Sequence, residues 1–195
     1  MIAKKIAVAA VLLAAATAFS ADAAQRPAQK AAAARPAAQK APAIPEADAY
    51  VPIPGGVLPP TPARIYRGVF DARQGARRAR DLVPAVLMAA DEVNTFAAHG
   101  LVRENYKFAI VFHSTAADEA VMTDKRYRAR HGINNPNLPV LAKLKQAGVQ
   151  IYVCGQQLAA DKVKRSDVSP LVYVADDALV AIMTLSAQGY TPLVF

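Results

Sequence analysis

The sequence predicts a three-layer α/β/α sandwich with a mostly parallel five-stranded sheet. Short β-rich apolar runs, too brief for helices, recur along the C-terminal part of the chain, and helical stretches lie between them. Parallel strands joined through helices require right-handed crossovers, which place helices on both faces of the sheet. This alternation indicates one α/β domain, for which we expect the limits 63–195.

Five segments are expected to form the sheet. The first four are β-rich and are bounded by breakers or charged residues. The fifth contains Pro192, which has no N–H group to donate to a neighbouring strand, so we expect this strand to be short and to lie at a sheet edge. The expected strands are residues 65–70, 107–112, 149–153, 171–174 and 190–195.

Four longer helices are expected between the strands. Pro84 is tolerated in the first turn of the first helix, and Gly148 and Gly189 are C-cap signals after the third and fourth. The second helix is expected to break near Asp124. The expected helices cover residues 81–99, 116–130, 136–147 and 176–188, with a short helical stretch at 156–160.

Residues 1–23 have the pattern of a secretory signal peptide. Lys4 and Lys5 precede an apolar run over residues 6–19, and Ala21 and Ala23 supply the small residues that a signal peptidase reads. A retained membrane anchor is the alternative, but the run is shorter than the roughly 20 residues that a helix needs to cross a bilayer. We therefore expect cleavage after Ala23 and a bacterial protein that is periplasmic or secreted, with no membrane contact after cleavage.

Residues 24–62 are expected to form a disordered Ala/Pro-rich tether. Most of the 14 prolines of the chain lie in this segment. Proline interrupts helices, and few large apolar side chains are available to order the segment. Val51, Ile53, Val57 and Leu58 are the side chains there that could pack on the domain surface.

Composition and motifs exclude several classes of function. The formal net charge of +8 is diffuse and is not interleaved with aromatic residues, so we expect no nucleic-acid binding. One cysteine permits neither an intramolecular disulfide nor a thiolate-only zinc site, and with three histidines we expect no metal. Because the glycine patterns of phosphate-binding loops are missing from the sequence, we also expect no nucleotide and no cofactor.

Polar residues that follow the predicted strands are the candidate site residues, because ligands of parallel sheets bind beyond the carboxyl ends of the strands. These residues share one rim if their strands are neighbours. They are Asp71, Arg73, Gln74 and Gly75 after the first strand, His113, Ser114 and Thr115 after the second, and Cys154, Gly155, Gln156 and Gln157 after the third.

Arg73 is also part of an arginine cluster with Arg77, Arg78 and Arg80. The cluster is a candidate anion site next to the rim, suited to a sulfur oxyanion. The alternative is a solvated basic loop.

Cys154 is the strongest candidate for chemistry. It precedes Gly155 and a short helical stretch, whose backbone N–H groups would favour the nucleophilic thiolate. His113 is a candidate base or thiolate partner if the second and third strands are adjacent. The alternatives are that Cys154 is a small buried apolar residue and that His113 is a hydrogen-bonded structural residue.

The region from His131, with the sequence HGINNPNLPVLAKLKQAGVQIYVCGQQLAA, resembles the DsrE/DsrF-like family. The matching motifs are an Asn-Pro-Asn turn at residues 135–137, a helix that ends in glycine, and a strand that ends in Cys-Gly-Gln at residues 154–156. The resemblance extends from Arg64 to the segment 178–190. It therefore covers the whole predicted domain and none of the tether.

The resemblance implies a five-stranded parallel sheet in the order 4-3-2-1-5 and a homo-oligomer, either a trimer or a hexamer. It also implies sulfur relay, in which the cysteine matching Cys154 carries sulfur as a persulfide. Gly155 and Gln156 would then supply amide groups to a small sulfur compound or face a sulfur-relay protein, and Asp71 and Arg73 would lie beside them. The activity would be at most that of a sulfurtransferase-like carrier.

The predicted helix at 176–188 bears on assembly and on the alternative function. Leu179, Val180, Ile182, Met183 and Leu185 spread around it more widely than packing on one sheet face requires, so part of the helix is expected to contact another subunit. The alternative to a sulfur carrier is a non-catalytic oligomeric binding or scaffold module with an inert cysteine.

Overall fold

The computed structural model describes residues 42–195 of the chain. The predicted signal peptide and residues 24–41 of the predicted tether lie outside this range. In the described part of the chain, no helix is both long enough and apolar enough to cross a membrane.

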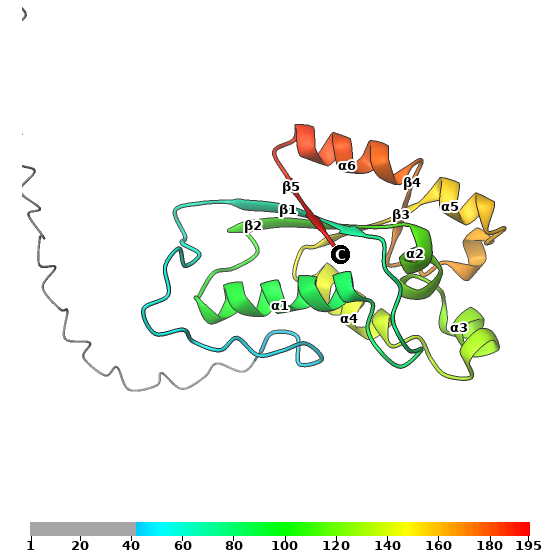
Figure 1. The fold of residues 1–195 in the computed structure, drawn as a ribbon, viewed down its shortest axis with the longest axis horizontal. Helices are drawn as coiled ribbons and strands as arrows, with labels where there is room; N and C mark the ends of the chain where they lie inside the picture. The colour runs from blue at the N-terminus through cyan, green and yellow to red at the C-terminus, as the bar shows by residue number, and fades with distance from the viewer. Residues whose placement is uncertain (1–41) are drawn as a thin grey trace, which may run out of the picture. The chain divides into compact units, whose positions relative to one another are not determined.

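Strands and helices alternate along the described residues (Figure 1). The strands are β1 (Tyr66–Ala72), β2 (Tyr106–Phe112), β3 (Gln150–Cys154), β4 (Tyr173–Ala175) and β5 (Thr191–Val194). The helices are α1 (Pro84–Ala98), α2 (Ser114–Ala120), α3 (Asp124–His131), α4 (Asn137–Gln146), α5 (Gly155–Ala160) and α6 (Ala178–Ala187), with a 3-10 turn at Arg165–Asp167.

The predicted elements are confirmed to within a few residues at their ends. The predicted helix at 116–130 is two helices, α2 and α3, and they separate just before Asp124. Thr123 causes the second helix to begin there, because its side chain accepts a hydrogen bond from the Arg126 backbone N–H and so caps α3. Pro84 stands in the first turn of α1, as expected.

The five strands form one parallel sheet in the order β4-β3-β2-β1-β5. Strand β2 is therefore central, with β1 on one side and β3 on the other. Pro192 lies in β5 at one edge, where its missing N–H group is tolerated. The parallel fold class and the predicted order 4-3-2-1-5 are thus confirmed.

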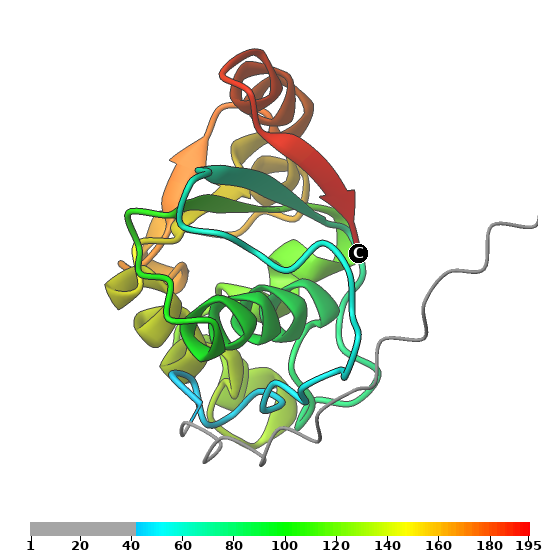
Figure 2. The same ribbon diagram turned by 90° about the vertical axis from the view of Figure 1, so that its left-hand side faces the viewer.

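Side-chain alternation along β2 divides the core between the two faces of the sheet. Phe108, Ile110 and Phe112 belong to the large cluster beneath α1 and α4, whereas Ala109 and Val111 belong to a smaller cluster beneath α6. Figures 1 and 2 show α6 on one side of the sheet and α1 and α4 on the other. The three-layer arrangement is therefore present, with far more apolar packing on the α1 face.

Residues 42–62 contain no helix or strand, yet part of this segment is held against α1. Ile44 is fully buried, and its backbone N–H and C=O both hydrogen-bond the side chain of Asn94, at 2.8 and 3.0 Å. The four apolar side chains that were candidates for packing on the domain, at positions 51, 53, 57 and 58, are all exposed. The packed part of the chain therefore begins before residue 63, which is the start that we expected for the domain.

A buried asparagine in the Asn-Pro-Asn motif joins three helices. The Asn135 amide nitrogen donates to the backbone carbonyls of Ala120 and Met122, at 3.2 and 2.8 Å, and to that of Glu119 at 3.0 Å. Its backbone N–H donates to the Asp124 carboxylate at 2.8 Å. These bonds tie the end of α2 and the start of α3 to the turn that precedes α4.

The second asparagine of the motif extends this network to α1. The Asn137 backbone N–H and side-chain amide both donate to Asn135 Oδ1 at 3.0 Å. Asn137 Oδ1 accepts a hydrogen bond from the backbone N–H of Val83, the residue that immediately precedes α1. Both asparagines are buried, so the motif holds the loops together from inside the core.

We expect Asn135→Ala to lower the free energy of unfolding by about 3 kcal/mol or more, because it leaves several buried carbonyls and an amide without partners. Urea denaturation measures the change. Asn105→Ala is the control: it also removes bonds to two backbone groups, but these lie at the surface, and we expect a loss of about 1 kcal/mol. Equal losses in the two variants would contradict a buried network.

Candidate functional site

The carboxyl ends of β1, β2 and β3 bring three predicted residues to one side of the sheet. Ala72 pairs with Phe112 and Phe112 with Val153, so the three strands end at the same level. Cys154 packs in the cluster beneath α6, and strand alternation directs Asp71 and His113 to that same face. We call this set of strand ends, from Asp71 to Arg73, His113 to Thr115 and Cys154 to Gln156, the rim.

Asp71 links two other residues of the rim. Its Oδ1 lies 2.6 Å from His113 Nε2, and its Oδ2 lies 3.2 Å from Arg73 Nε. Asp71 is only 8% exposed, so these two partners satisfy a carboxylate that has little access to water. Because a carboxylate oxygen can only accept, Nε2 of His113 carries the proton in this bond, so Nδ1 is the acceptor whenever the imidazole is neutral.

Cys154 is the last residue of β3 and stands immediately before α5. It is a free cysteine with 5% exposure, and it packs beside Val111 and Ala178. Across the sheet it pairs with Ala175 of β4. Among the described residues no hydrogen bond joins its sulfur to His113, although Cys154 ends β3 and His113 directly follows the neighbouring strand β2.

Gly155 allows α5 to begin close to the end of β4. A Cβ atom at this position would lie 2.8 Å from the backbone oxygen of Ala175 and 3.1 Å from that of Asp176. Any larger residue would push these carbonyls away, so glycine is required by close approach of two backbones. The next residue, Gln156, is exposed at the rim.

The arginine cluster divides at the rim. Arg73 forms the ion pair with Asp71, whereas Arg77, Arg78 and Arg80 are exposed on the loop that follows β1. Only Arg73 is therefore held beside His113. The loop itself is fixed to α2, because Thr115 Oγ1 accepts from the Gly75 N–H at 2.9 Å and donates to the Arg73 carbonyl.

Three tyrosines lie near Cys154 on the same face of the sheet. The rings of Tyr152 and Tyr173 are 5.9 Å apart on neighbouring strands, and Tyr190 packs against the same cluster. Burial raises the pKa of the Tyr152 hydroxyl, and the other two phenols add to the shift. Tyr152 is therefore a neutral hydrogen-bond donor, and its O–H donates to Gln150 Oε1 at 3.2 Å.

A cavity of about 580 Å³ opens next to the rim. Ser114 and Thr115 line it from the start of α2, and Gln157 lines it from α5. The remaining lining residues are the charged side chains Asp118, Glu119, Arg126, Arg130 and Asp161. The sequence predicted Ser114, Thr115 and Gln157 at strand ends without assigning them a role, and strand-end position did not reveal the residues contributed by α3.

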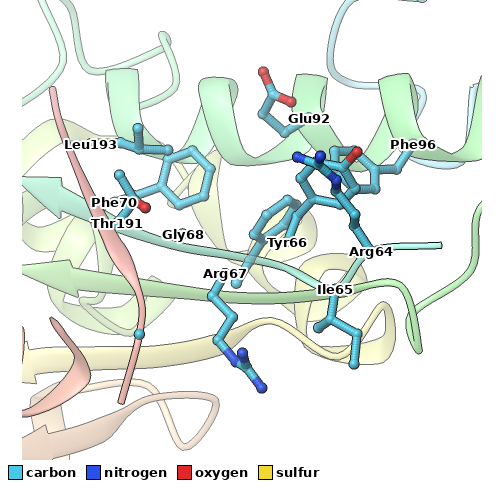
Figure 3. A pocket seen from close by; sticks show the side chains of 12 residues that line it. Arg64, Ile65, Tyr66, Arg67, Gly68, Phe70, Glu92, Phe96, Thr191 and Leu193 are labelled. Carbon is cyan, nitrogen blue, oxygen red and sulfur yellow. The ribbon is translucent and has the colours of Figure 1, made fainter. Parts of the chain in front are cut away.

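A second cavity, of about 440 Å³, lies at the opposite, amino end of β1. Figure 3 shows Glu92 and Phe96 reaching it from α1 and the rings of Tyr66 and Phe70 from β1. Partial burial raises the pKa of the Glu92 carboxyl, and the charge of Asp91 adds to the shift. Sequence reasoning did not single out this cavity, and it shares no residue with the rim.

Two further features concern the start of α6 and the grouping of side chains that could bind a metal. Asp177 Oδ1 accepts from the N–H groups of Leu179 and Val180, at 2.8 and 3.0 Å, so Asp177 caps α6. Within residues 42–195, no three His, Cys, Asp or Glu side chains are grouped to hold a metal ion.

The fold and the rim together define an α/β protein with a parallel 4-3-2-1-5 sheet and a cysteine at the carboxyl end of its third strand. The model of the DsrE/DsrF-like family matches residues 65–195, and the chain belongs to this family. Membership of the family suggests a role of the sulfur-relay type.

Among solved structures, the chain is similar to a protein of unknown function from Methanobacterium thermoautotrophicum, with 19% identity and a TM-score of 0.49 over 67% of this chain and 99% of the other. No curated protein matches the sequence.

We expect Gly155→Ala to lower the free energy of unfolding by about 1–3 kcal/mol, because the added methyl group meets two backbone carbonyls that cannot move independently. Gly68→Ala is the matched control on β1, where a Cβ atom would first meet Leu193 Cδ1 at an ordinary 3.4 Å. Chemical denaturation of both variants measures the difference. A Gly155→Ala variant as stable as Gly68→Ala would show that α5 and β4 can separate without cost.

Proposed function

We propose that this protein is an exported sulfur carrier in which Cys154 accepts sulfane sulfur as a persulfide. The observation that carries the proposal is the position of the single cysteine: it ends β3 at the rim, beside β2, which His113 directly follows. Family membership supports the same chemistry.

The transfer step needs a donor with a sulfane sulfur, such as a low-molecular-weight persulfide, R–S–SH. The Cys154 thiolate attacks the outer sulfur, so a new S–S bond forms at Cys154 while the S–S bond of the donor breaks. The electron pair of the broken bond leaves on R–S⁻. The products are the Cys154 persulfide and a thiolate, and the step requires no separate oxidant or reductant.

Charges at the rim fit a donor that is anionic. Arg73 is half exposed and bonded to Asp71 through Nε, so the rest of its guanidinium group can meet an incoming anion. The hydrogen-bonded side chains of Asp71 and His113 lie on the same face of the sheet as Cys154. They are polar groups close to a cysteine that otherwise packs among apolar residues. These residues would orient the donor before transfer.

Burial of Cys154 suits a carrier that works outside the cytoplasm. Exposed thiols in an oxidising compartment form disulfides or are overoxidised. As a residue, Cys154 is 5% exposed and packs beneath α6, which limits the contact of its thiol with oxidants in solution. The predicted signal peptide is what supports a periplasmic or secreted location.

The same burial favours a second candidate function. A cysteine that packs in the same apolar cluster as Val111 and Ala178 fills space as a small apolar residue would. In that case, the protein is an oligomeric binding or scaffold module, and Cys154 is inert.

We also propose that the protein is a homo-oligomer, a trimer or a hexamer. Leu179, Val180 and Met183 project from α6 and are more than half exposed. Tyr173 and Val174 on the neighbouring edge strand β4 are also exposed. An exposed apolar surface of this kind is typical of a protein interface.

Intact mass tests the carrier function on the native protein isolated from the periplasmic fraction of a bacterium that expresses the full chain. We expect a mature chain that begins near Ala24 and gains the mass of one sulfur atom on treatment with glutathione persulfide, and that loses it with a thiol reductant. Cys154→Ser removes the only thiol and should abolish the gain without loss of the fold. A wild-type protein that takes up no sulfur, and whose thiol is alkylated only in denaturant, would support the scaffold function instead.

Light scattering at micromolar concentration tests assembly. We expect a trimer or hexamer for the wild-type chain, and a smaller species when Leu179→Glu and Met183→Glu together place charge on the exposed side of α6. Ile53→Glu with Val57→Glu is the control, because it changes exposed apolar residues outside the helix. A monomeric wild-type protein would contradict the proposed assembly.

A further inference from the structure

A hydrogen-bonded chain of three side chains at the rim ends in a hydroxyl group. Asp71 Oδ1 lies 2.6 Å from His113 Nε2, and the other imidazole nitrogen, Nδ1, lies 3.4 Å from Ser114 Oγ. In the neutral imidazole, the Asp71 bond leaves Nδ1 as the acceptor, and Nδ1 is the nitrogen that faces the serine. The side chains of Asp71 and His113 are 12% and 15% exposed, so the base is held in a largely desolvated position.

Ser114 has an unusual backbone conformation. Its φ is +50°, a left-handed value that costs energy for any residue with a Cβ atom. Ser114 is the first residue of α2, which begins just after the central strand β2, and its side chain is exposed. A sharp turn of this kind after a central parallel strand presents a serine hydroxyl outside the sheet, as nucleophilic serines on strand-turn-helix elements require.

The hydroxyl has a cavity of suitable size beside it. Ser114 and Thr115 line the hollow of about 580 Å³, which is within the range of small-molecule sites. Most of its other lining residues are charged, and Arg126 and Arg130 both pair with Asp118. Such a lining favours a small polar acyl group over a long apolar one.

We propose that Ser114 is a nucleophile for acyl transfer from short-chain esters, with His113 as its base and Asp71 as the residue that positions His113. The Ser114 Oγ attacks the ester carbonyl while its proton passes to His113 Nδ1. The ester C–O bond then breaks, and the leaving alkoxide takes that proton and departs as an alcohol. Water hydrolyses the acyl-serine by the same route, which releases the acid and restores the hydroxyl.

This site does not depend on the sulfur chemistry proposed for Cys154. The cysteine is not among the residues that line the cavity, and it packs beneath α6 on the face of the sheet. Ester cleavage and sulfur loading can therefore be tested separately, and a negative result in one test does not contradict the other proposal.

Covalent labelling of the full chain tests the nucleophile. A fluorophosphonate probe followed by peptide mass spectrometry should place one adduct on Ser114 in the wild-type protein. The adduct should persist in Cys154→Ser and in Ser166→Ala, which removes another exposed serine. It should disappear in Ser114→Ala, a change at an exposed position that leaves the core intact.

Hydrolysis of p-nitrophenyl acetate tests the base and its positioning residue. His113→Ala should slow the reaction by about a hundredfold or more, and added imidazole should restore part of the rate. Asp71→Asn should lower kcat and leave KM unchanged, because Asp71 does not line the cavity. The hexanoate ester should be cleaved more slowly than the acetate.

Ser114→Gly separates strain from reactivity. Glycine adopts positive φ without cost, so this variant should unfold at a higher temperature than Ser114→Ala, yet show no labelling. No adduct on wild-type Ser114, or an adduct that forms equally fast in His113→Ala, would overturn the proposal.

Discussion

The parallel pairing of β2 with β1 and β3 determines where every chemically active side chain of the rim lies. Residues that face each other across parallel strands project to the same side, so the register that matches Ala72, Phe112 and Val153 also aligns the residues just beyond them. Asp71 and His113 meet because their strands are neighbours, although 42 positions separate them in sequence. A shift of one residue in the β1–β2 pairing would turn Asp71 and His113 to opposite faces of the sheet, and the same shift in the β2–β3 pairing would separate His113 from Cys154.

The loops that leave this sheet are held in place by buried polar groups rather than by apolar packing alone. Asn135 binds backbone carbonyls at the end of α2, and Asn137 binds the N–H of Val83 before α1. Since α2 carries Ser114 and Thr115 at its start, the network that fixes its end also limits movement at the rim. A motif that serves to recognise the family thus has a mechanical role in this chain.

The two faces of the sheet differ in how much apolar packing covers them. Beneath α1 and α4, a large aromatic and aliphatic cluster holds most of the buried apolar residues, while α6 covers only a small cluster built around Val69, Ala109 and Val111. Cys154 lies on the thinly covered face. The face with less packing is therefore the one that carries the candidate chemistry, and its exposed helix and edge strand are available to other molecules.

Local patterns in the sequence determined the elements of this protein. Short β-rich runs, glycines after helices, and Pro192 at an edge strand reflect interactions within a few residues, so the five strands and their approximate limits could be predicted, and Cys154 could be placed at a strand end. The pairing of Asp71 with both Arg73 and His113, the near-complete burial of Cys154, the anchoring of Ile44 by Asn94 and the positive φ of Ser114 were decided only by tertiary structure. The physical reason is that distances between side chains, and their access to water, depend on strand register and helix packing between segments far apart in the chain, which no local pattern encodes.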